Sequence, residues 1–435
     1  MKRAITISIL LICYFSAIGQ KNKIYSSLHE AFKNKEQVYK LNLSYNKLTE
    51  FSDSIAQLPH LQYLNLEGNK INTIPPSIGS LKNLRTLNLK KNAITELTDQ
   101  ICNLKDIEVL LLSENQIQKL PDCIGNLKNL GWLFLRNNKI ETLPESFGGL
   151  SNLIKLDLSE NQIHGLPVSF GSFDKLKELL LQKNRLSNLP ANIGGLKNIE
   201  ALNLSDNEME ELPDSFGNLK NLEWLICKNN KIKNIPESLG TITKLKLLYL
   251  NSNEIDKLPK TLGNLINLRD LNISGNSFSK AEKNKSKQLL PNCKISFKNT
   301  YYSIQKAIAY KKNVDVLHLS DNNLTELPEH IEEFKNLQEL YLGNNQLQSL
   351  PKSIEKLKKL ETLSLSYNSI TKLPGFINKL KNLQQLDLDN NQLSCLPESI
   401  RDLKKLKNIY LSGNPFTKDE KEKIQKLLPD CNIYF

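Results

Sequence analysis

The sequence predicts an α/β solenoid, in which short parallel strands and short helical return segments alternate along a curved array. The first observation is that one asparagine recurs every 23 residues within the pattern LxLxxNxLxxLPxxIGxLxxL, eleven times without a break. The second is that the same spacing resumes after a gap of two periods and continues for five more units. A coil of this kind buries its leucines only against its neighbours, so the period indicates a stack of coils. The asparagines are Asn46, Asn69, Asn92, Asn115, Asn138, Asn161, Asn184, Asn207, Asn230, Asn253 and Asn276, followed by Asn322, Asn345, Asn368, Asn391 and Asn414.

Each position of the repeat has a physical role in such a coil. Leucines five and three residues before the asparagine, such as Leu133 and Leu135, are expected to point into the core, because side chains alternate between the two faces of a strand. The residues between them therefore face the open, concave side. The asparagine amide is expected to satisfy backbone groups where the chain leaves the strand, which makes a buried polar ladder. Proline six residues later, as in Pro144, begins the return segment with a fixed φ.

The gap separates two arrays that have closely similar ends. The segment KAEKNKSKQLLPNCKISF, which ends at Phe297, matches KDEKEKIQKLLPDCNIYF, which ends at Phe435, and the segments before the first asparagine of each array also match. We interpret these segments as an opening helix and as a closing helix with a strand, which cover the ends of the core. The predicted domains are a signal peptide at 1–19, a capped array of eleven repeats at 24–297 and a capped array of five repeats at 298–435. The short link favours one continuous solenoid over two hinged arrays.

With these motifs, residues 24–435 resemble leucine-rich repeat proteins of the LPxxIGxLxxL type, which include Ras-suppressor-like arrays, plant disease-resistance-like arrays and exported bacterial proteins. The resemblance implies a right-handed horseshoe, with a parallel β-sheet on the concave face, short helical or 3₁₀ returns on the convex face, and helices as caps. It implies binding without identifying the ligand, because proteins of this fold bind many unrelated partners.

The first residues have the layout of a bacterial-type secretory signal peptide. Lys2 and Arg3 precede an apolar run from Ala4 to Ile18, which contains about fifteen residues. A membrane-spanning helix needs roughly 20, so cleavage near Gly19 is favoured over a retained anchor. We therefore expect an exported protein, periplasmic or secreted, with no membrane span after signal cleavage. The alternative is an intracellular signalling scaffold whose N-terminus stays uncleaved.

The sequence predicts no catalytic site, no cofactor and no metal. The five histidines are scattered, and the motifs HExxH, CxxC, GxSxG and the P-loop are absent. The net charge of +12 comes from lysines spread along the chain, which is typical of a solvated surface and predicts no nucleic-acid partner. One lysine column, about thirteen residues after the asparagine, runs along the return side and includes Lys128 and Lys220. We interpret it as a solubilising ladder, with weak contact to an anionic glycan of the cell envelope as the alternative.

Six cysteines follow the predicted signal peptide. Cys227 occupies a core leucine position, and Cys293 and Cys431 are equivalent residues of the two closing caps, so we interpret all three as small buried hydrophobes. Cys102 and Cys123 are expected on the return sides of adjacent coils, two positions out of phase. This offset favours two free thiols, and a disulfide in an oxidising compartment stays open as the alternative.

The candidate binding site lies on the concave face of the first array. Six and four residues before the asparagine, two pairs of adjacent coils have apolar residues with a cation beside them, whereas the coils around them are more polar. The only two tryptophans of the chain occupy the same repeat position four coils apart, which separates them by ~19 Å at ~4.8 Å per strand. Aromatic residues beside arginine or lysine are typical of protein-binding hot spots, and the alternative is that these side chains merely pack on one another. The predicted ligand-binding residues are Val109, Leu111, Trp132, Phe134, Arg136, Trp224, Ile226, Lys228, Leu247 and Tyr249.

These observations predict a non-catalytic, monomeric protein-binding module. The partner is expected to be a protein or an extended peptide, because anchors so far apart suit a long contact better than a small molecule. The second array is more polar at the equivalent positions, so we expect it to contribute less to binding.

Overall fold

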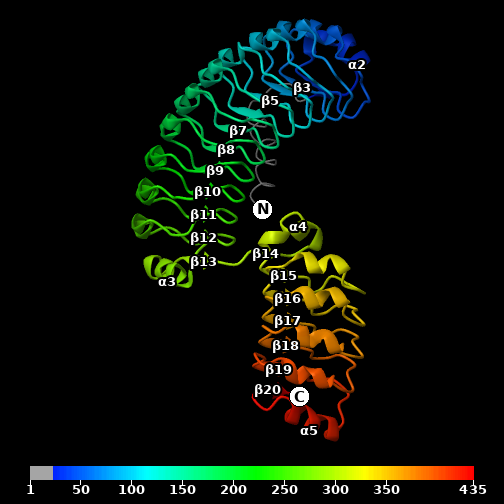
Figure 1. The fold of residues 1–435 in the computed structure, drawn as a ribbon. Helices are drawn as coiled ribbons and strands as arrows, with labels where there is room; N and C mark the ends of the chain where they lie inside the picture. The colour runs from blue at the N-terminus through cyan, green and yellow to red at the C-terminus, as the bar shows by residue number, and fades with distance from the viewer. Residues whose placement is uncertain (1–22) are drawn as a thin grey trace. The chain divides into compact units, whose positions relative to one another are not determined.

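The computed structural model describes residues 23–435, and Figure 1 shows their fold. The signal peptide predicted at residues 1–19 lies outside the described residues. Each repeat forms one coil, which consists of a short strand, a turn at the asparagine and a 3₁₀-helical return. The strands are β1 (Ile24–Tyr25), β2 (Lys40–Asn42), β3 (Tyr63–Asn65), β4 (Thr86–Asn88), β5 (Val109–Leu111), β6 (Trp132–Phe134), β7 (Lys155–Asp157), β8 (Glu178–Leu180), β9 (Ala201–Asn203), β10 (Trp224–Ile226), β11 (Leu247–Tyr249), β12 (Asp270–Asn272), β13 (Lys294–Ser296), β14 (Thr300–Tyr301), β15 (Val316–His318), β16 (Glu339–Tyr341), β17 (Thr362–Ser364), β18 (Gln385–Asp387), β19 (Asn408–Tyr410) and β20 (Asn432–Tyr434).

Within each array the strands form a parallel sheet in sequence order. Strands β1 to β13 make a 13-stranded sheet, and β14 to β20 make a 7-stranded sheet. The register matches the repeat, since Leu133 of β6 lies opposite Leu156 of β7, one period later. In the first array the strands line the inner side of an arc and the returns line its outer side (Figure 1). The predicted solenoid with a concave parallel sheet is therefore confirmed.

The returns are short 3₁₀ helices. Proline stands just before most of them in an extended conformation, as Pro144 does with φ −70° and ψ 151°. The N–H of Leu150 then closes the return by donating to the Phe147 carbonyl at 3.2 Å. The 3₁₀ helices are η1 (Lys35–Gln37), η2 (Asp53–Gln57), η3 (Pro76–Ser80), η4 (Asp99–Asn103), η5 (Ile124–Asn126), η6 (Glu145–Gly149), η7 (Val168–Ser172), η8 (Ala191–Gly195), η9 (Asp214–Asn218), η10 (Glu237–Thr241), η11 (Lys260–Asn264), η12 (Lys311–Asn313), η13 (Glu329–Glu333), η14 (Lys352–Lys356), η15 (Gly375–Lys379) and η16 (Glu398–Asp402).

The α-helices lie where the sequence predicts caps. They are α2 (Leu28–Lys33), α3 (Lys280–Leu289), α4 (Ile304–Ile308) and α5 (Lys418–Leu427). Each begins after a serine or threonine whose hydroxyl accepts a hydrogen bond from a backbone N–H three residues later, as Ser279 does from Glu282 at 3.2 Å. Helix α3 packs against η11 and α5 packs against η16, so each covers the last coil of its array.

The core of each array is a stack of aliphatic ladders. The inward-pointing residues of the strands are fully buried, and Leu133 and Leu135 are both 0% exposed. Three phenylalanines enlarge the core between η6 and η7, where the rings of Phe170 and Phe173 meet edge to face with centroids 5.0 Å apart. Because every coil is covered on both sides, the strands are held rigidly without help from the concave surface.

The repeated asparagine forms the predicted polar ladder. The Asn138 amide donates to the carbonyls of Leu112 and Leu135 at 3.0 and 2.9 Å, and its oxygen accepts from the Ile117 N–H at 2.9 Å. One side chain therefore satisfies backbone groups of its own coil and of the coil before it. The residue ahead of it, Asn137, has φ 55°, and equivalent residues in most coils share this left-handed conformation. The hydrogen bonds of the Asn138 side chain hold the turn in that strained geometry.

We expect Asn138→Ala to lower the free energy of unfolding by about 3 kcal/mol, because it leaves the buried Ile117 N–H without a partner and removes one of the two asparagine donors from each of the Leu112 and Leu135 carbonyls. Urea denaturation followed by circular dichroism measures this loss. The matched control is Asn152→Ala, which removes only solvent-accessible bonds, one to the Lys128 carbonyl and one from Lys175 Nζ, and should change stability by less than ~1 kcal/mol. Equal losses for the two variants would contradict the ladder's role.

Candidate protein-binding surface

The first predicted patch lies on strands β5 and β6. Val109 pairs with Trp132 and Leu111 pairs with Phe134, so the four side chains form one cluster on the concave face. Leu111, Trp132 and Phe134 are half-buried, which leaves part of each side chain open to a partner. Val109 is only 1% exposed. Its prediction as a contact residue is wrong, because the neighbouring side chains cover it.

The second patch lies on strands β10 and β11. Trp224 pairs with Leu247 and Ile226 pairs with Tyr249. Trp224 is 38% exposed, and the other three side chains are half-buried. The Tyr249 hydroxyl donates to Asp270 Oδ2 at 3.1 Å. Burial and the nearby Asp270 carboxylate raise the pKa of Tyr249, so the phenol stays protonated at physiological pH.

The two predicted cations lie beside these patches and are paired with carboxylates. Arg136 Nη2 lies 3.2 Å from Glu160 Oε1, and Lys183 Nζ contacts the same oxygen at 2.9 Å. These hydrogen bonds, with that of Lys183 the larger influence, lower the pKa of Glu160. Lys228 Nζ lies 3.9 Å from Asp206 Oδ2, which is a weaker pairing. Both cations are therefore oriented on the rim of the aromatic surface.

A polar strip separates the two patches. Lys155 Nζ of β7 lies 2.8 Å from Glu178 Oε2 of β8, and the lysine side chain is only 14% exposed. The same Nζ lies 5.7 Å from the ring centroid of Phe134, at cation–π distance. Lys155 and Glu178 are not among the predicted site residues, although they stand one period apart on neighbouring strands, because that prediction selects only apolar positions with a cation beside them.

Charged pairs also border the strands on the side where the chain enters them. They link neighbouring coils seven residues before the asparagine, but Gly131 and Ile154 interrupt them beside the first patch. Beside β6 this position is therefore uncharged, whereas Glu108 precedes β5. The pairs are Arg85 with Glu108 at 3.2 Å, Lys177 with Glu200 at 2.8 Å and Lys246 with Glu223 at 2.7 Å.

The lysine column of the return side contacts the protein's own backbone. Lys128 Nζ donates to the Gly149 carbonyl at 2.7 Å, and Lys220 Nζ donates to the Thr241 carbonyl at 3.3 Å. In each case the acceptor ends the 3₁₀ helix of the next coil. These contacts give the column a structural role, which weakens the interpretation of it as a glycan site.

The second array also has aromatic residues on its concave face. Tyr302, His318 and Tyr341 form a continuous stack, with ring centroids 5.5 and 4.2 Å apart. Sequence analysis missed this stack, because Tyr302 lies in the opening cap, outside the regular repeat. The strand pairing of β14 with β15 brings it into register with His318.

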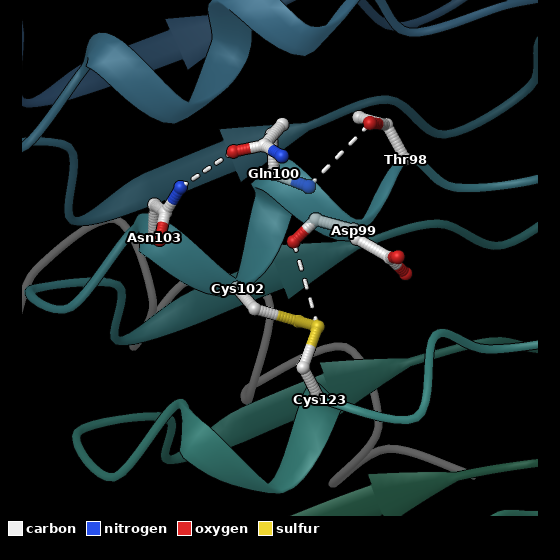
Figure 2. Close-up of a disulfide and its surroundings, with 6 residues drawn as sticks. All are labelled: Thr98, Asp99, Gln100, Cys102, Asn103 and Cys123. Atoms are coloured by element: carbon white, nitrogen blue, oxygen red, sulfur yellow. Dashed lines mark hydrogen bonds between the residues drawn. A yellow bond between two sulfur atoms is a disulfide. The ribbon is translucent and has the colours of Figure 1, made fainter.

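The structure contains a disulfide between Cys102 and Cys123, with Cα atoms 5.9 Å apart (Figure 2). The interpretation of these residues as two free thiols is therefore wrong. Cys102 occupies the glycine position of the repeat, and Cys123 occupies a position that is often serine in the next coil. These positions are in contact in other coils as well, since a Cβ on Gly217 would lie 2.8 Å from Ser238 Cβ. Neighbouring returns pack diagonally, so the residues that meet are 21 apart and not 23.

The three cysteines interpreted as small buried hydrophobes agree only in part with that prediction. Cys227 is buried in the core as expected. Cys293 and Cys431 are partly exposed, so the prediction that both are buried is wrong. Each lies between the closing helix and the last strand of its array. Burial still raises the pKa of both thiols to about 11.

Within residues 23–435, no group of three or more His, Cys, Asp or Glu side chains is arranged to hold a metal ion. No helix in that part of the chain is both long enough and apolar enough to span a membrane.

We expect the Cys102→Gly, Cys123→Ser double variant to fold, because it restores the glycine and serine of the other coils. It should lose about 3 kcal/mol of stability, the usual effect of a crosslink that closes a loop of this size. Thermal unfolding of the oxidised wild type, the reduced wild type and the variant measures the difference. Peptide mapping under non-reducing conditions that finds both thiols free would contradict the pairing.

Asp157 of β7 provides a pH-dependent prediction. Burial raises the pKa of this carboxyl, so its ionised form is disfavoured in the folded state. The stability that it contributes is complete below the unfolded pKa of about 3.9 and is lost as the pH rises through the folded pKa. We expect Asp157→Asn to raise the unfolding temperature at pH 7 but not near pH 3. A variant less stable than wild type at pH 7 would contradict this assignment.

Comparisons with known proteins agree with this architecture. The leucine-rich repeat region family matches residues 37–134 and 171–296, and the leucine rich repeat family matches 142–186, 312–370 and 360–416. The search of curated proteins gave no match.

Three solved structures are similar along most of the chain. A leucine-rich repeat protein of Leptospira interrogans is 32% identical, with 95% of this chain and 100% of that chain covered at a TM-score of 0.53. The plant peptide hormone receptor RGFR1, in complex with RGF2, is 27% identical; the match covers 93% of this chain and 75% of that chain, with a TM-score of 0.56. The Arabidopsis receptor kinase HAESA, in complex with the peptide hormone IDA and the co-receptor SERK1, is 26% identical; the match covers 90% of this chain and 65% of that chain, with a TM-score of 0.53. From its repeat register and these matches, the chain belongs to the leucine-rich repeat family.

Proposed function

We propose that this protein is a non-catalytic binding module that presents the concave face of its first array to a protein or extended peptide outside the cytoplasm. The observation that carries the proposal is the pair of partly exposed aromatic patches on β5–β6 and β10–β11. The side chains of both patches point away from the core, whose inward leucines on the same strands are fully buried on the opposite face of the sheet.

The rigidity of the surface supports this proposal. Strands β5, β6, β10 and β11 each lie between two parallel neighbours, and the turn after β6 is held by the buried Asn138. A partner that binds there orders little of this chain, so less of the binding free energy is lost. Trp132, Phe134 and Arg136 form the principal contact, followed by Trp224, Lys228 and Tyr249, because large aromatic side chains and arginine dominate the energetics of interfaces.

The relatives support a peptide-like partner. Two of the similar structures are plant receptors. One is the peptide hormone receptor RGFR1 in complex with RGF2, and the other is HAESA in complex with the peptide hormone IDA. We extend only the class of partner to this chain, and we propose that it acts as a monomer.

The disulfide supports a location outside the cytoplasm. Disulfides form and persist in oxidising compartments and are rare where glutathione keeps thiols reduced. Together with the signal-peptide layout of the first residues, it favours export over the intracellular scaffold. We propose cleavage after about residue 19 and two capped arrays, at 24–297 and 298–435, of which the first carries the principal surface.

The test is affinity capture from culture medium and cell envelope with the mature protein as bait. The triple variant Trp132→Ala, Phe134→Ala, Trp224→Ala should lose the partner by at least tenfold, because it removes the exposed aromatic area of both patches. The control is Tyr302→Ala, Tyr341→Ala, which alters the aromatic stack of the second array and should retain the partner. Circular dichroism confirms that both variants are folded.

Equal capture by the triple variant and the wild type would overturn the proposal for the concave face. Capture that falls steeply with salt and is unaffected by the tryptophan changes would instead favour the anionic-glycan alternative. Intact Met1 in a cytosolic fraction would overturn export.

A further inference from the structure

Asp157 carries a charge that the fold does not require. It stands four residues before the repeated asparagine, at a position that is asparagine in several other coils, including Asn203. Asn203 Oδ1 accepts from the N–H and hydroxyl of Ser205 at 3.0 and 2.6 Å. Asp157 Oδ1 accepts the same two bonds from Ser159, at 3.0 and 2.5 Å. One oxygen is enough for the turn, and an amide supplies it equally well.

The second oxygen of Asp157 has no hydrogen-bond donor among residues 23–435. The residue is only 8% exposed, and its register partners on the neighbouring strands are Phe134 and Leu180, both apolar. Lys155 is on the same strand, but its hydrogen-bonded partner is Glu178. The concave face therefore has a carboxylate oxygen without a partner, between two apolar side chains.

The equivalent aspartate of the second array differs in this respect. Asp387 has the same repeat position, and its Oδ1 accepts from the Asp389 N–H at 3.2 Å. Its Oδ2 is already occupied, because the Ser364 hydroxyl donates to it at 2.8 Å. Asp387 is thus a structural residue, and it provides a matched control for Asp157.

We propose that Asp157 determines the specificity of the concave site by accepting a hydrogen bond at Oδ2 from a lysine or arginine side chain of an extended peptide. This inference rests on the proposed function, and it names the chemistry of the partner. Lys155 and Arg136 attract Asp157 electrostatically, but each lies within hydrogen-bonding distance of another carboxylate, Glu178 and Glu160 respectively, and neither donates a hydrogen bond to Asp157. The raised pKa of Asp157 reflects the same desolvation that strengthens its attraction for a cation from the partner.

The strand spacing defines the rest of the motif. The first aromatic patch begins one strand from Asp157, and Trp224 of β10 lies three strands away on the other side, or ~14 Å at ~4.8 Å per strand. An extended peptide that crosses the strands advances ~3.3 Å per residue. The partner segment therefore has an apolar residue one or two positions from its basic residue, and a second apolar residue about four positions away in the other direction.

A displayed library of random peptides about twelve residues long tests this motif on the full mature chain. Selection on the wild type should enrich peptides with one lysine or arginine between apolar residues. Asp157→Asn keeps both bonds to Ser159 and should bind such a peptide about tenfold to hundredfold more weakly, the usual effect of losing a charge-assisted hydrogen bond. Replacing the basic residue of the peptide with methionine should weaken binding to the wild type equally and leave binding to Asp157→Asn unchanged. Asp387→Asn should bind as the wild type does.

The outcomes separate this inference from the function on which it rests. Peptides that require Trp132, Phe134 and Trp224 but bind Asp157→Asn as tightly as the wild type would overturn the role of Asp157 and leave the proposed function intact. A selection that returns no peptide dependent on the three aromatic residues would overturn both.

Discussion

The hydrogen bonds of the buried asparagine ladder are the interaction on which the rest of this structure depends. Each short strand is followed by a turn. In most coils the residue just before the repeated asparagine has a left-handed conformation, as Asn137 does. Without the Asn138 amide, the buried Ile117 N–H would have no partner, and the Leu112 and Leu135 carbonyls would each lose one of two donors. The amide therefore joins each coil to the preceding one at the end of the strand, and the parallel sheet sets the spacing of the strands.

Successive side chains of each strand point to opposite faces of the sheet, so one set packs in the core and the other set lies on the concave face. Inward leucines supply the buried apolar area, and the asparagines satisfy the backbone groups of the turns. The residue types at the outward positions are therefore less constrained by the stability of the fold. Tryptophan, lysine, aspartate and tyrosine therefore occupy the same outward positions in different coils. Val109 is an exception, because its larger neighbours cover it and it becomes part of the packing.

The return side is constrained more tightly than its 3₁₀ geometry suggests. In most coils of the first array glycine lies there, because the return of the next coil approaches too closely for a Cβ, as at Gly217. Lysines then bond to the carbonyls that end the following return. At the one junction where cysteine replaces glycine, a covalent bond takes the place of close packing. The convex surface is thus committed to stacking, and the concave surface is available for a partner.

The sequence by itself determined the solenoid, the strand positions, the buried leucines, the asparagine ladder and the outward position of both tryptophans, because each depends only on the place of a residue within the period. Only the tertiary structure decided what depends on the offset between coils. That offset pairs Cys102 with Cys123, and the strand pairing at the opening cap stacks Tyr302 on His318. Lys155 and Glu178, like Asp157 and its neighbours Phe134 and Leu180, are one period apart and follow from the repeat itself. The physical reason is that a period identifies equivalent residues, whereas contact between coils also requires the diagonal shift of the returns and the pairing of strands outside the regular repeat.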